Sequence, residues 1–259
     1  MLMMPPISHA GYITIETTTT VTVTGNTASI RITATNKGDE PANNVRMTLT
    51  FASKDLSGDL KDVIAIKGSY SSEFTVPIEF KKPGRYPIIV SVEYTDANLY
   101  PFSALSVSYL NYNNPANAMV SGDISQLDLA DKGKLSIKAK NIDSVERKFN
   151  IRLVSSKDFS VLQPETSISV GPGKEKSVSF DIKNISALPG SKYQVFAILS
   201  YEDDSRYYST ITSGTINVKK HKGIFNIYLT ILTAILAGLV MLLVYKIVRP
   251  KKDSSSKDS

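Results

Sequence analysis

The chain has 259 residues, 42% of them hydrophobic and 21% charged, as in a folded protein, and its lack of cysteine excludes disulfides, thiolate nucleophiles and thiolate metal sites. Residues 11–218 hold 22 basic and 22 acidic residues, whereas residues 219–259 hold the other 8 basic and 2 acidic ones, which give the net charge of +6. Because nucleic-acid binding requires a basic surface, this distribution argues against nucleic acid as a partner.

The first ten residues, MLMMPPISHA, are interpreted as the remnant of a signal peptide. Ser8 and Ala10 occupy positions −3 and −1 of a cleavage-type site before Gly11, behind a short apolar stretch. That stretch is shorter than a complete signal and has no basic start, so we expect the native signal peptide to be longer. Without a signal, the protein would be tail-anchored with its folded part in the cytosol.

Residues 11–110 predict a first β-sandwich domain. Strand-like runs recur roughly every 8–12 residues between turn segments such as Lys82-Pro83-Gly84. The expected strands lie near residues 12–24, 27–36, 43–51, 61–68, 73–80, 85–94 and 102–110. The run of threonines at 17–20 fits a β-branched edge strand better than an O-glycosylated stalk.

The clearest alternation in the first domain is at residues 85–94. One face carries Tyr86, Ile88, Val90, Val92 and Tyr94, and the other carries Arg85, Pro87, Ile89, Ser91 and Glu93. This period of two indicates a half-buried antiparallel strand with the first set inward. We therefore expect truncation of the outward Ile89 to cost less stability than truncation of the inward Ile88.

A second sandwich domain is predicted at residues 119–218. The polar, proline-containing segment NYNNPANA at 111–118 shows no alternation and is interpreted as the linker. The strands of the second domain are expected near residues 119–128, 133–141, 147–155, 160–170, 174–183, 191–201 and 207–218. The run at 192–201 places Tyr193, Val195, Ala197, Leu199 and Tyr201 inward and Phe196 outward.

The two domains are related by an internal repeat of about 105 residues. Ile30, Ile32, Ala34 and Asn36 correspond to Leu135, Ile137, Ala139 and Asn141, and SKDLS at 53–57 corresponds to SKDFS at 156–160. The strand count and the length of each copy favour an immunoglobulin-like sandwich. Tyr86 and Tyr193, each shortly after a Pro-Gly turn, resemble tyrosine corners, with simple burial at a strand end as the alternative.

Residues 224–245 (IFNIYLTILTAILAGLVMLLVY) form a run of 22 residues without a charge. A helix of this length spans about 33 Å, enough for a hydrocarbon core of about 30 Å. Basic residues flank it and aromatic residues lie at its ends, as in a transmembrane helix: Lys219, Lys220, Lys222, Lys246, Arg249, Lys251, Lys252, Phe225, Tyr228 and Tyr245. We interpret residues 219–248 as the anchor and 249–259 as a cytoplasmic tail.

The expected fold class is therefore all-β: two tandem immunoglobulin-like seven-stranded β-sandwiches followed by a single transmembrane α-helix. Within the helix, Thr230, Ala234 and Gly238 lie four residues apart on one face. Such a ridge of small residues lets two helices approach closely and predicts helix packing in a homodimer. The alternative is that the ridge packs against nothing, since small residues are common in membrane helices.

Two segments of the first copy carry a family resemblance: ATNKGDEPANNVRMTLTF at 34–51 and KKPGRYPIIVSVEY at 81–94. They resemble the N-x-G-x-x-x-A-x-x-V and P-G-x-Y stretches of CARDB-like and related immunoglobulin-like sandwich domains of archaeal and bacterial surface proteins. The second copy keeps the strands but lacks the glycine of the first stretch. The resemblance implies an extracellular adhesive, spacer or S-layer-associated module, and it carries over no catalytic residue.

Few residues suggest a catalytic site, a metal site or a site of modification. Glu202, Asp203 and Asp204 could attract a hard cation, but consecutive acids point in different directions, and we favour a solvated loop without a metal. Asn184 begins an N-glycosylation sequon, Asn184-Ile185-Ser186. The only histidines, His9 and His221, lie outside the predicted sandwiches, so these cannot build a His-containing triad or zinc site.

The predicted function is a non-enzymatic structural or interaction protein of the cell envelope. It would be a single-pass membrane protein without a cofactor, with its two domains outside the cell and a protein partner in the envelope. The alternative is an accessory subunit of a membrane complex such as an exporter or the secretion machinery. A hydrolase of surface polymers would need an acid-lined cleft that the sequence does not reveal.

Overall fold

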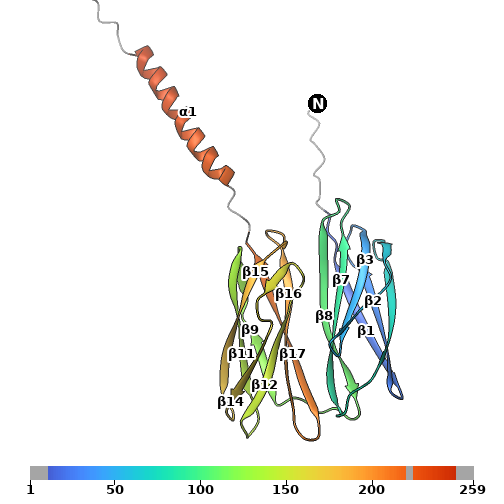
Figure 1. Ribbon diagram of the computed structural model, residues 1–259. Helices are drawn as coiled ribbons and strands as arrows, with labels where there is room; N and C mark the ends of the chain where they lie inside the picture. Colours follow the sequence, from blue (N-terminus) through green and yellow to red (C-terminus); the bar gives the residue numbers. More distant parts are fainter. Residues whose placement is uncertain (1–10, 220–223, 249–259) are drawn as a thin grey trace, which may run out of the picture. The chain divides into compact units, whose positions relative to one another are not determined.

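The structure is a computed structural model that describes residues 11–219 and 224–248 (Figure 1). Contacts divide the chain into a compact β unit up to Lys219 and a second unit from Lys220 onward that contains the helix. The two units are described separately. Residues 1–10, interpreted from the sequence as the remnant of a signal peptide with Ser8, His9 and Ala10, lie outside the described residues, as do His221 and residues 249–259.

The N-terminal half of the β unit is a sandwich of two antiparallel sheets. One sheet has the order β1-β2-β6, and the other places β7 between β3 and β8, with the short β4 and β5 beside β3. The strands are β1 (Ile15–Thr24), β2 (Thr27–Asn36), β3 (Ala42–Phe51), β4 (Lys54–Ser57), β5 (Lys61–Ile64), β6 (Ser69–Pro77), β7 (Gly84–Thr95) and β8 (Pro101–Tyr112).

The C-terminal half repeats this plan. One sheet has the order β13-β15-β11-β9, and the other has the order β14-β12-β16-β17, with β10 parallel to β17. The pair of Tyr207 with Gly84 joins β17 to β7, so the second sheets of the two halves run on into each other. The strands are β9 (Val120–Ile124), β10 (Leu127–Leu129), β11 (Lys132–Asn141), β12 (Arg147–Val154), β13 (Phe159–Val161), β14 (Glu165–Val170), β15 (Glu175–Asn184), β16 (Lys192–Glu202) and β17 (Tyr207–Val218). The all-β sandwich prediction is confirmed, and this sheet arrangement is consistent with immunoglobulin-like domains.

Each half has its own hydrophobic core between its two sheets. The predicted register of β7 is confirmed, because Ile88, Val90 and Val92 are fully buried in the first core. The same holds for β16, whose inward set fills the second core. Alternation therefore predicts correctly which side of both strands faces the core.

Two buried asparagines occupy equivalent places in the two halves. Asn36 donates from Nδ2 to the carbonyl oxygens of Glu40 and Ile64, and its Oδ1 accepts from the amide of Gly38. Asn141 bonds in the same way, with Nδ2 donating to the carbonyl of Val145 and Oδ1 accepting from the amide of Asp143. Both side chains satisfy backbone groups where a strand ends and a loop begins.

The tyrosine corners are also present in both halves. The hydroxyl of Tyr86 donates to the carbonyl of Lys82 at 2.7 Å, whereas the hydroxyl of Tyr193 accepts from the amide of Leu188 at 3.0 Å. Each bond ties the start of a central strand to the loop before it. The polarity of the bond differs, but the corner prediction is confirmed.

The predicted strands differ from the observed ones where a turn interrupts them. The strand expected at 61–68 stops at Ile64 because the chain turns back between Ala65 and Gly68, with Lys67 at a φ of 60°. The strand expected at 160–170 is two strands, because the chain crosses from one sheet to the other around Pro164. A proline or a residue with a positive φ marks a turn within a few residues of the chain. The passage of the chain from one sheet to the other depends on tertiary structure, so the local sequence does not predict it.

The helix α1 (Ile224–Val248) lies in the second unit, and its side chains are described at residues 231–242, 244 and 245. Among the residues that the structure describes, no helix combines the length and the hydropathy that a membrane crossing requires.

Candidate functional site

The acidic loop after β16 is a structural loop. The carboxylate of Asp203 accepts hydrogen bonds from Ser205, the amide of Arg206 and the hydroxyl of Tyr208. Burial alone would raise the pKa of Asp203, but these bonds outweigh it and lower the pKa to about 2. Within the described residues no group of acidic or histidine side chains is arranged to hold a metal.

The same loop binds the other half of the β unit. The ammonium of Lys82 donates to the carbonyl of Asp203 at 2.6 Å and lies 3.5 Å from the carboxylate of Glu202. Lys82 belongs to the turn before β7 in the N-terminal half. The loop predicted as solvated therefore takes part in a contact between the halves, which the sequence did not reveal.

The glycosylation sequon lies at the end of β15. Asn184 is partly buried, its Oδ1 accepts from the amide of Ala187, and its Nδ2 donates to the carbonyl of Ala187 at 3.2 Å. The hydroxyl of Ser186 donates to Asp158 at 3.0 Å. Asn184 stays a predicted acceptor, and a glycan there would replace a proton of the amide that makes this turn.

The helix ridge is described in part. Ala234 and Gly238 are exposed on α1, and a Cβ added to Gly238 would meet no atom within 4 Å. The side chain of Thr230 lies outside the described residues. Helix packing through this ridge stays a prediction.

The most extensive feature is an apolar contact between the two halves. Ile89, Val154, Phe196 and Ile198 are buried in a third cluster, against the partly buried Leu105, Val107 and Ile211. These are outward residues of β7, β8, β12, β16 and β17, so the two central sheets pack on each other (Figure 1). The expectation that Ile89 lies on a less buried face is wrong, because the other half covers it.

Polar contacts secure one end of this interface. Gly84 and Tyr207 pair in parallel register, and the amide of Tyr207 donates to the carbonyl of Pro83 at 2.9 Å. The rings of Tyr86 and Tyr207 stack with centroids 4.6 Å apart. The two strands are therefore joined by backbone as well as side chains.

The other end is held by charged and hydroxyl groups. Lys157 forms an ion pair with Glu93 of β7. The buried carboxylate of Asp158 accepts from the hydroxyl of Ser103 in β8 at 3.1 Å and from those of Ser156 and Ser186 in its own half. With both ends of the contact secured, the two halves form one packed body.

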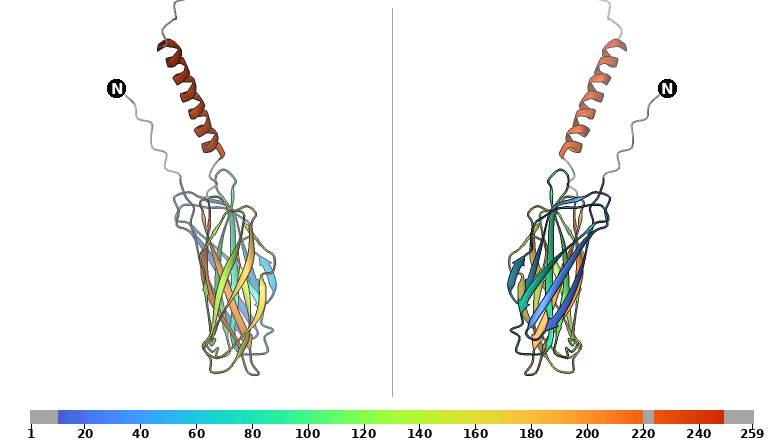
Figure 2. Two further views of the ribbon diagram at one scale, coloured as in Figure 1. Left: turned by 90° about the vertical axis from the view of Figure 1, so that its left-hand side faces the viewer. Right: turned by 90° about the vertical axis from the view of Figure 1, so that its right-hand side faces the viewer.

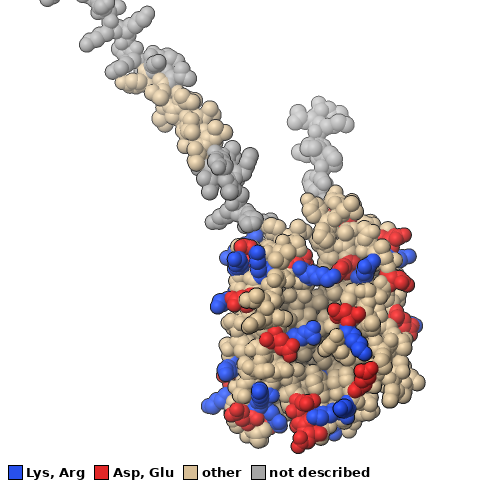
Figure 3. All heavy atoms as spheres, viewed as in Figure 1, with Lys and Arg blue, Asp and Glu red and all other residues tan. Residues whose placement is uncertain are grey.

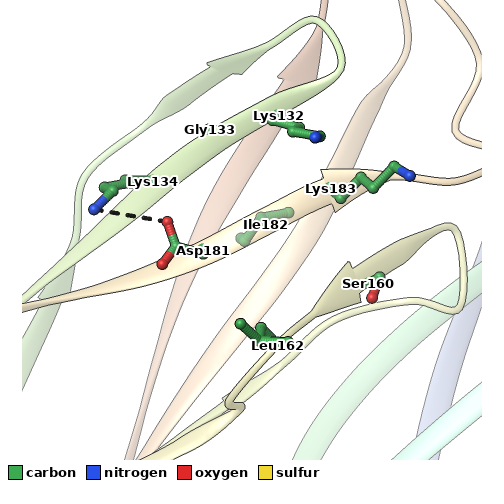
Figure 4. A pocket seen from close by; sticks show the side chains of 8 residues that line it. All are labelled: Lys132, Gly133, Lys134, Ser160, Leu162, Asp181, Ile182 and Lys183. Carbon is green, nitrogen blue, oxygen red and sulfur yellow. Dashed lines mark ion pairs between the residues drawn. The ribbon is translucent and has the colours of Figure 1, made fainter.

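Two hollows are the candidates for small-molecule binding. One of about 380 Å³ lies beside the contact between the halves, where Asp55, Glu93, Arg152 and Lys157 surround an apolar floor. The other, of about 510 Å³, lies on the outer face of β11 and β15 (Figure 4). There Lys132 lies opposite Lys183 in register, and the neighbouring Lys134 pairs with Asp181 at 3.7 Å. Neither hollow brings together the residues singled out from the sequence.

Charges of both signs are interspersed on the face of the β unit that Figure 3 shows, without an extended area of one sign. The surface of the β unit also carries ion pairs, such as Arg31 with Glu73 at 2.9 Å and Lys140 with Glu175 at 3.6 Å. This face gives no basic stripe along which a phosphate backbone could lie.

Several solved structures are distantly similar to the chain. A fragment of Escherichia coli alpha-2-macroglobulin, from domain MG7 to its C-terminus, is 16% identical and has a TM-score of 0.34, over 40% of this chain and 17% of its own. Trypsin-activated E. coli alpha-2-macroglobulin is 13% identical with a TM-score of 0.32, over 80% of this chain and 18% of its own. Red sea bream transglutaminase is 11% identical with a TM-score of 0.28, over 80% of this chain and 31% of its own.

The chain thus spans less than a third of each of these three proteins, and likeness at this level carries no activity over to it. No protein-family model matches the chain, and no curated protein sequence matches it either.

Proposed function

We propose that the chain is a non-enzymatic, single-pass membrane protein of the cell envelope that presents two immunoglobulin-like sandwiches outside the cell as one rigid body. The observation that carries this proposal is the packing of the two halves through β7, β8, β16 and β17. An enzyme brings its catalytic residues together in a cleft. In this chain, the buried apolar cluster and the strand pairing between the halves instead hold one sandwich against the other.

Rigid pairing favours a structural or interaction role. Flexible tandem domains present their loops in varying directions, so each partner contact costs ordering entropy. With the halves locked, the outer sheets β1-β2-β6 and β13-β15-β11-β9 keep a fixed relation to each other. A fixed pair of faces is suited to lateral contacts with other envelope proteins, in keeping with the resemblance to S-layer-associated modules.

The membrane anchor is supported by the sequence of residues 224–245. This run of 22 residues has no charge, and it falls within α1 (Ile224–Val248). The basic residues on both sides of it are typical of segments that end at lipid head groups. The cleavage-type site before Gly11 supports export of the sandwiches.

Alkaline carbonate extraction tests the anchor. We expect the full chain to stay with the membrane pellet and to be released only by detergent. The variant Ile235→Asp/Leu239→Asp should move to the supernatant, because each acidic residue near the centre of the run costs about 2.5–3.5 kcal/mol of insertion free energy. The matched control Ile235→Leu/Leu239→Ile should behave like the parent chain. Release of the parent chain by carbonate would refute membrane anchoring.

Protease added to intact cells tests the topology. We expect both sandwiches to be degraded and a fragment with the helix and tail to survive. Protection of the sandwiches until lysis would place them in the cytosol and overturn the envelope proposal. Co-purification after mild detergent extraction then identifies the partner, and a polytopic exporter subunit would favour the alternative role in a membrane complex.

A further inference from the structure

The two halves differ in how they close the side where the first and last strands of a sandwich meet. In the C-terminal half, the chain leaves the β13-β15-β11-β9 sheet after β9, and the next strand, β10, pairs in parallel with the last strand, β17, from Leu127↔Ile216 to Leu129↔Val218. Leu129 is fully buried there, and its carbonyl accepts from the amide of Lys219 at 2.7 Å. The short β10 therefore closes this side of the sandwich.

The N-terminal half lacks this closure. β1 pairs with β2 without interruption from Ile15↔Asn36 to Thr24↔Thr27, and no other described strand pairs with it. No residue of β1 is fully buried, and even the inward Val21 is only half-buried, whereas its partner Ile30 on β2 is fully buried. β1 thus forms one edge of the first sandwich (Figure 2, right-hand view, blue strands), and the core residue Val21 at this edge is only half-buried.

This edge also lacks the features that usually prevent strands from pairing. Edge strands are commonly short, bulged, or guarded by Lys or Pro. β4 and β5 have four residues each and contain lysine, and β13 has three. β8 begins with Pro101, and the C-terminal half covers its outer face. β1 has ten residues, IETTTTVTVT, with Glu16 as its only charge and an unbroken register.

We propose that the free edge of β1 pairs antiparallel with β1 of a second copy of this chain, which joins two three-stranded sheets into one. A twofold axis makes each residue near the centre face itself or a close neighbour. Threonine and valine suit such cross-strand contacts. With the axis near Thr20, Glu16 faces Thr24 rather than a second Glu16, so the one charge opposes no like charge.

A cysteine scan tests this pairing, because the chain has no cysteine of its own. Single substitutions to Cys at positions 18, 19, 20, 21 and 22 are made in the full chain and exposed to mild oxidation. Opposed residues in an antiparallel pair have Cα atoms about 4.5–5.5 Å apart, within disulfide range. We expect a disulfide-linked dimer whose yield peaks at one position and falls several-fold on either side.

The matched control is Thr33→Cys. Thr33 lies in the central strand β2, directly opposite Thr18 of β1. The Thr33→Cys variant contains the same helix α1 as the β1 variants, so any association through α1 affects the dimer yield of all of them equally. A yield at Thr33 equal to the β1 maximum would indicate face-to-face stacking and overturn the edge proposal. So would the absence of a dimer at all five β1 positions, or a cross-link only to another protein.

A charge swap provides the second test. Thr20→Lys and Thr20→Glu each place like charges across the twofold axis, so each variant alone should form several-fold less dimer than the parent in sedimentation analysis. An equimolar mixture should recover the dimer, because the charges then attract each other. Variants that dimerise as well as the parent, or a mixture that does not recover, would show that β1 does not pair with itself.

Discussion

Gly84 of β7 and Tyr207 of β17 lie side by side in parallel register although they belong to different halves of the chain. A Cβ on Gly84 would collide with the carbonyl oxygen of Tyr207, a backbone atom that cannot rotate away. Glycine is therefore required here for close approach of two strands.

Substitution of Gly84 should weaken the contact between the two halves. Gly84→Ala is expected to lower the free energy of unfolding by about 1–3 kcal/mol, because the strands must separate to admit the methyl group. Urea unfolding of the full chain, followed by tyrosine fluorescence, measures this. Gly171→Ala is the matched control, since its Cβ would meet only the side chain of Lys174 at 3.7 Å, and it should have little effect. Equal effects of the two substitutions would contradict the close approach.

Outward residues at the contact should behave as core residues. Ile89→Ala is expected to cost about 2–4 kcal/mol and Phe196→Ala about 3–5 kcal/mol, because both side chains are 7% exposed between the halves. Ile142→Ala, at a side chain that is 52% exposed, should cost less than about 0.5 kcal/mol. If Ile89→Ala cost as little as Ile142→Ala in the same unfolding assay, the two central sheets would not be packed together.

The buried asparagines should be needed in both halves. Asn36→Ala or Asn141→Ala leaves buried backbone carbonyls without a donor, at a cost of about 1–3 kcal/mol each. Asn98→Ala, at an exposed position in the loop after β7, provides the control. Thermal unfolding of the three variants compares them. If only one of the variants Asn36→Ala and Asn141→Ala lost stability, the two copies of the repeat would not share the role of this residue.

Asp203 should make stability depend on pH in the acid range. Its pKa is lowered from 3.8 to about 2 in the folded chain, so its contribution to stability is fully present above about pH 4 and is lost as the pH falls through 2. The difference in stability between the parent and Asp203→Asn should therefore shrink between about pH 4 and pH 2. Parallel pH profiles for the two proteins would contradict the hydrogen-bonded carboxylate.

The sequence predicts most strands and the inward sets because alternation is a local property. Ile88 and Val195 are buried as predicted. It does not reveal the contact between the halves, because an apolar outward residue such as Ile89 is compatible with either solvent or another sheet. Ile89, Phe196 and Ile198 were the available signal, since each puts a large apolar side chain on a face predicted to be outward.

The repeated SKD segment shows why a motif did not reveal its role. In SKDFS, Lys157 and Asp158 bind Glu93 and Ser103 of the other half. In SKDLS, Lys54 pairs with the exposed Glu79 at 3.6 Å, and Asp55 accepts from Thr50 of its own half. Equivalent residues of the two copies thus make contacts between the halves in the second copy and contacts within their own half in the first copy. That difference depends on tertiary packing, which the repeat itself does not encode.

The rigid pairing of the two sandwiches is tested most directly by a distance measurement between them. Spin labels at Thr33→Cys on β2 and Ser177→Cys on β15 report on the outer sheets of the two halves in a chain that has no other cysteine. Double electron–electron resonance should give a single narrow distance distribution, and Gly84→Ala/Ile89→Ala should broaden it. A broad distribution in the parent that these substitutions leave unchanged would show that the halves move independently, and would contradict the rigid body.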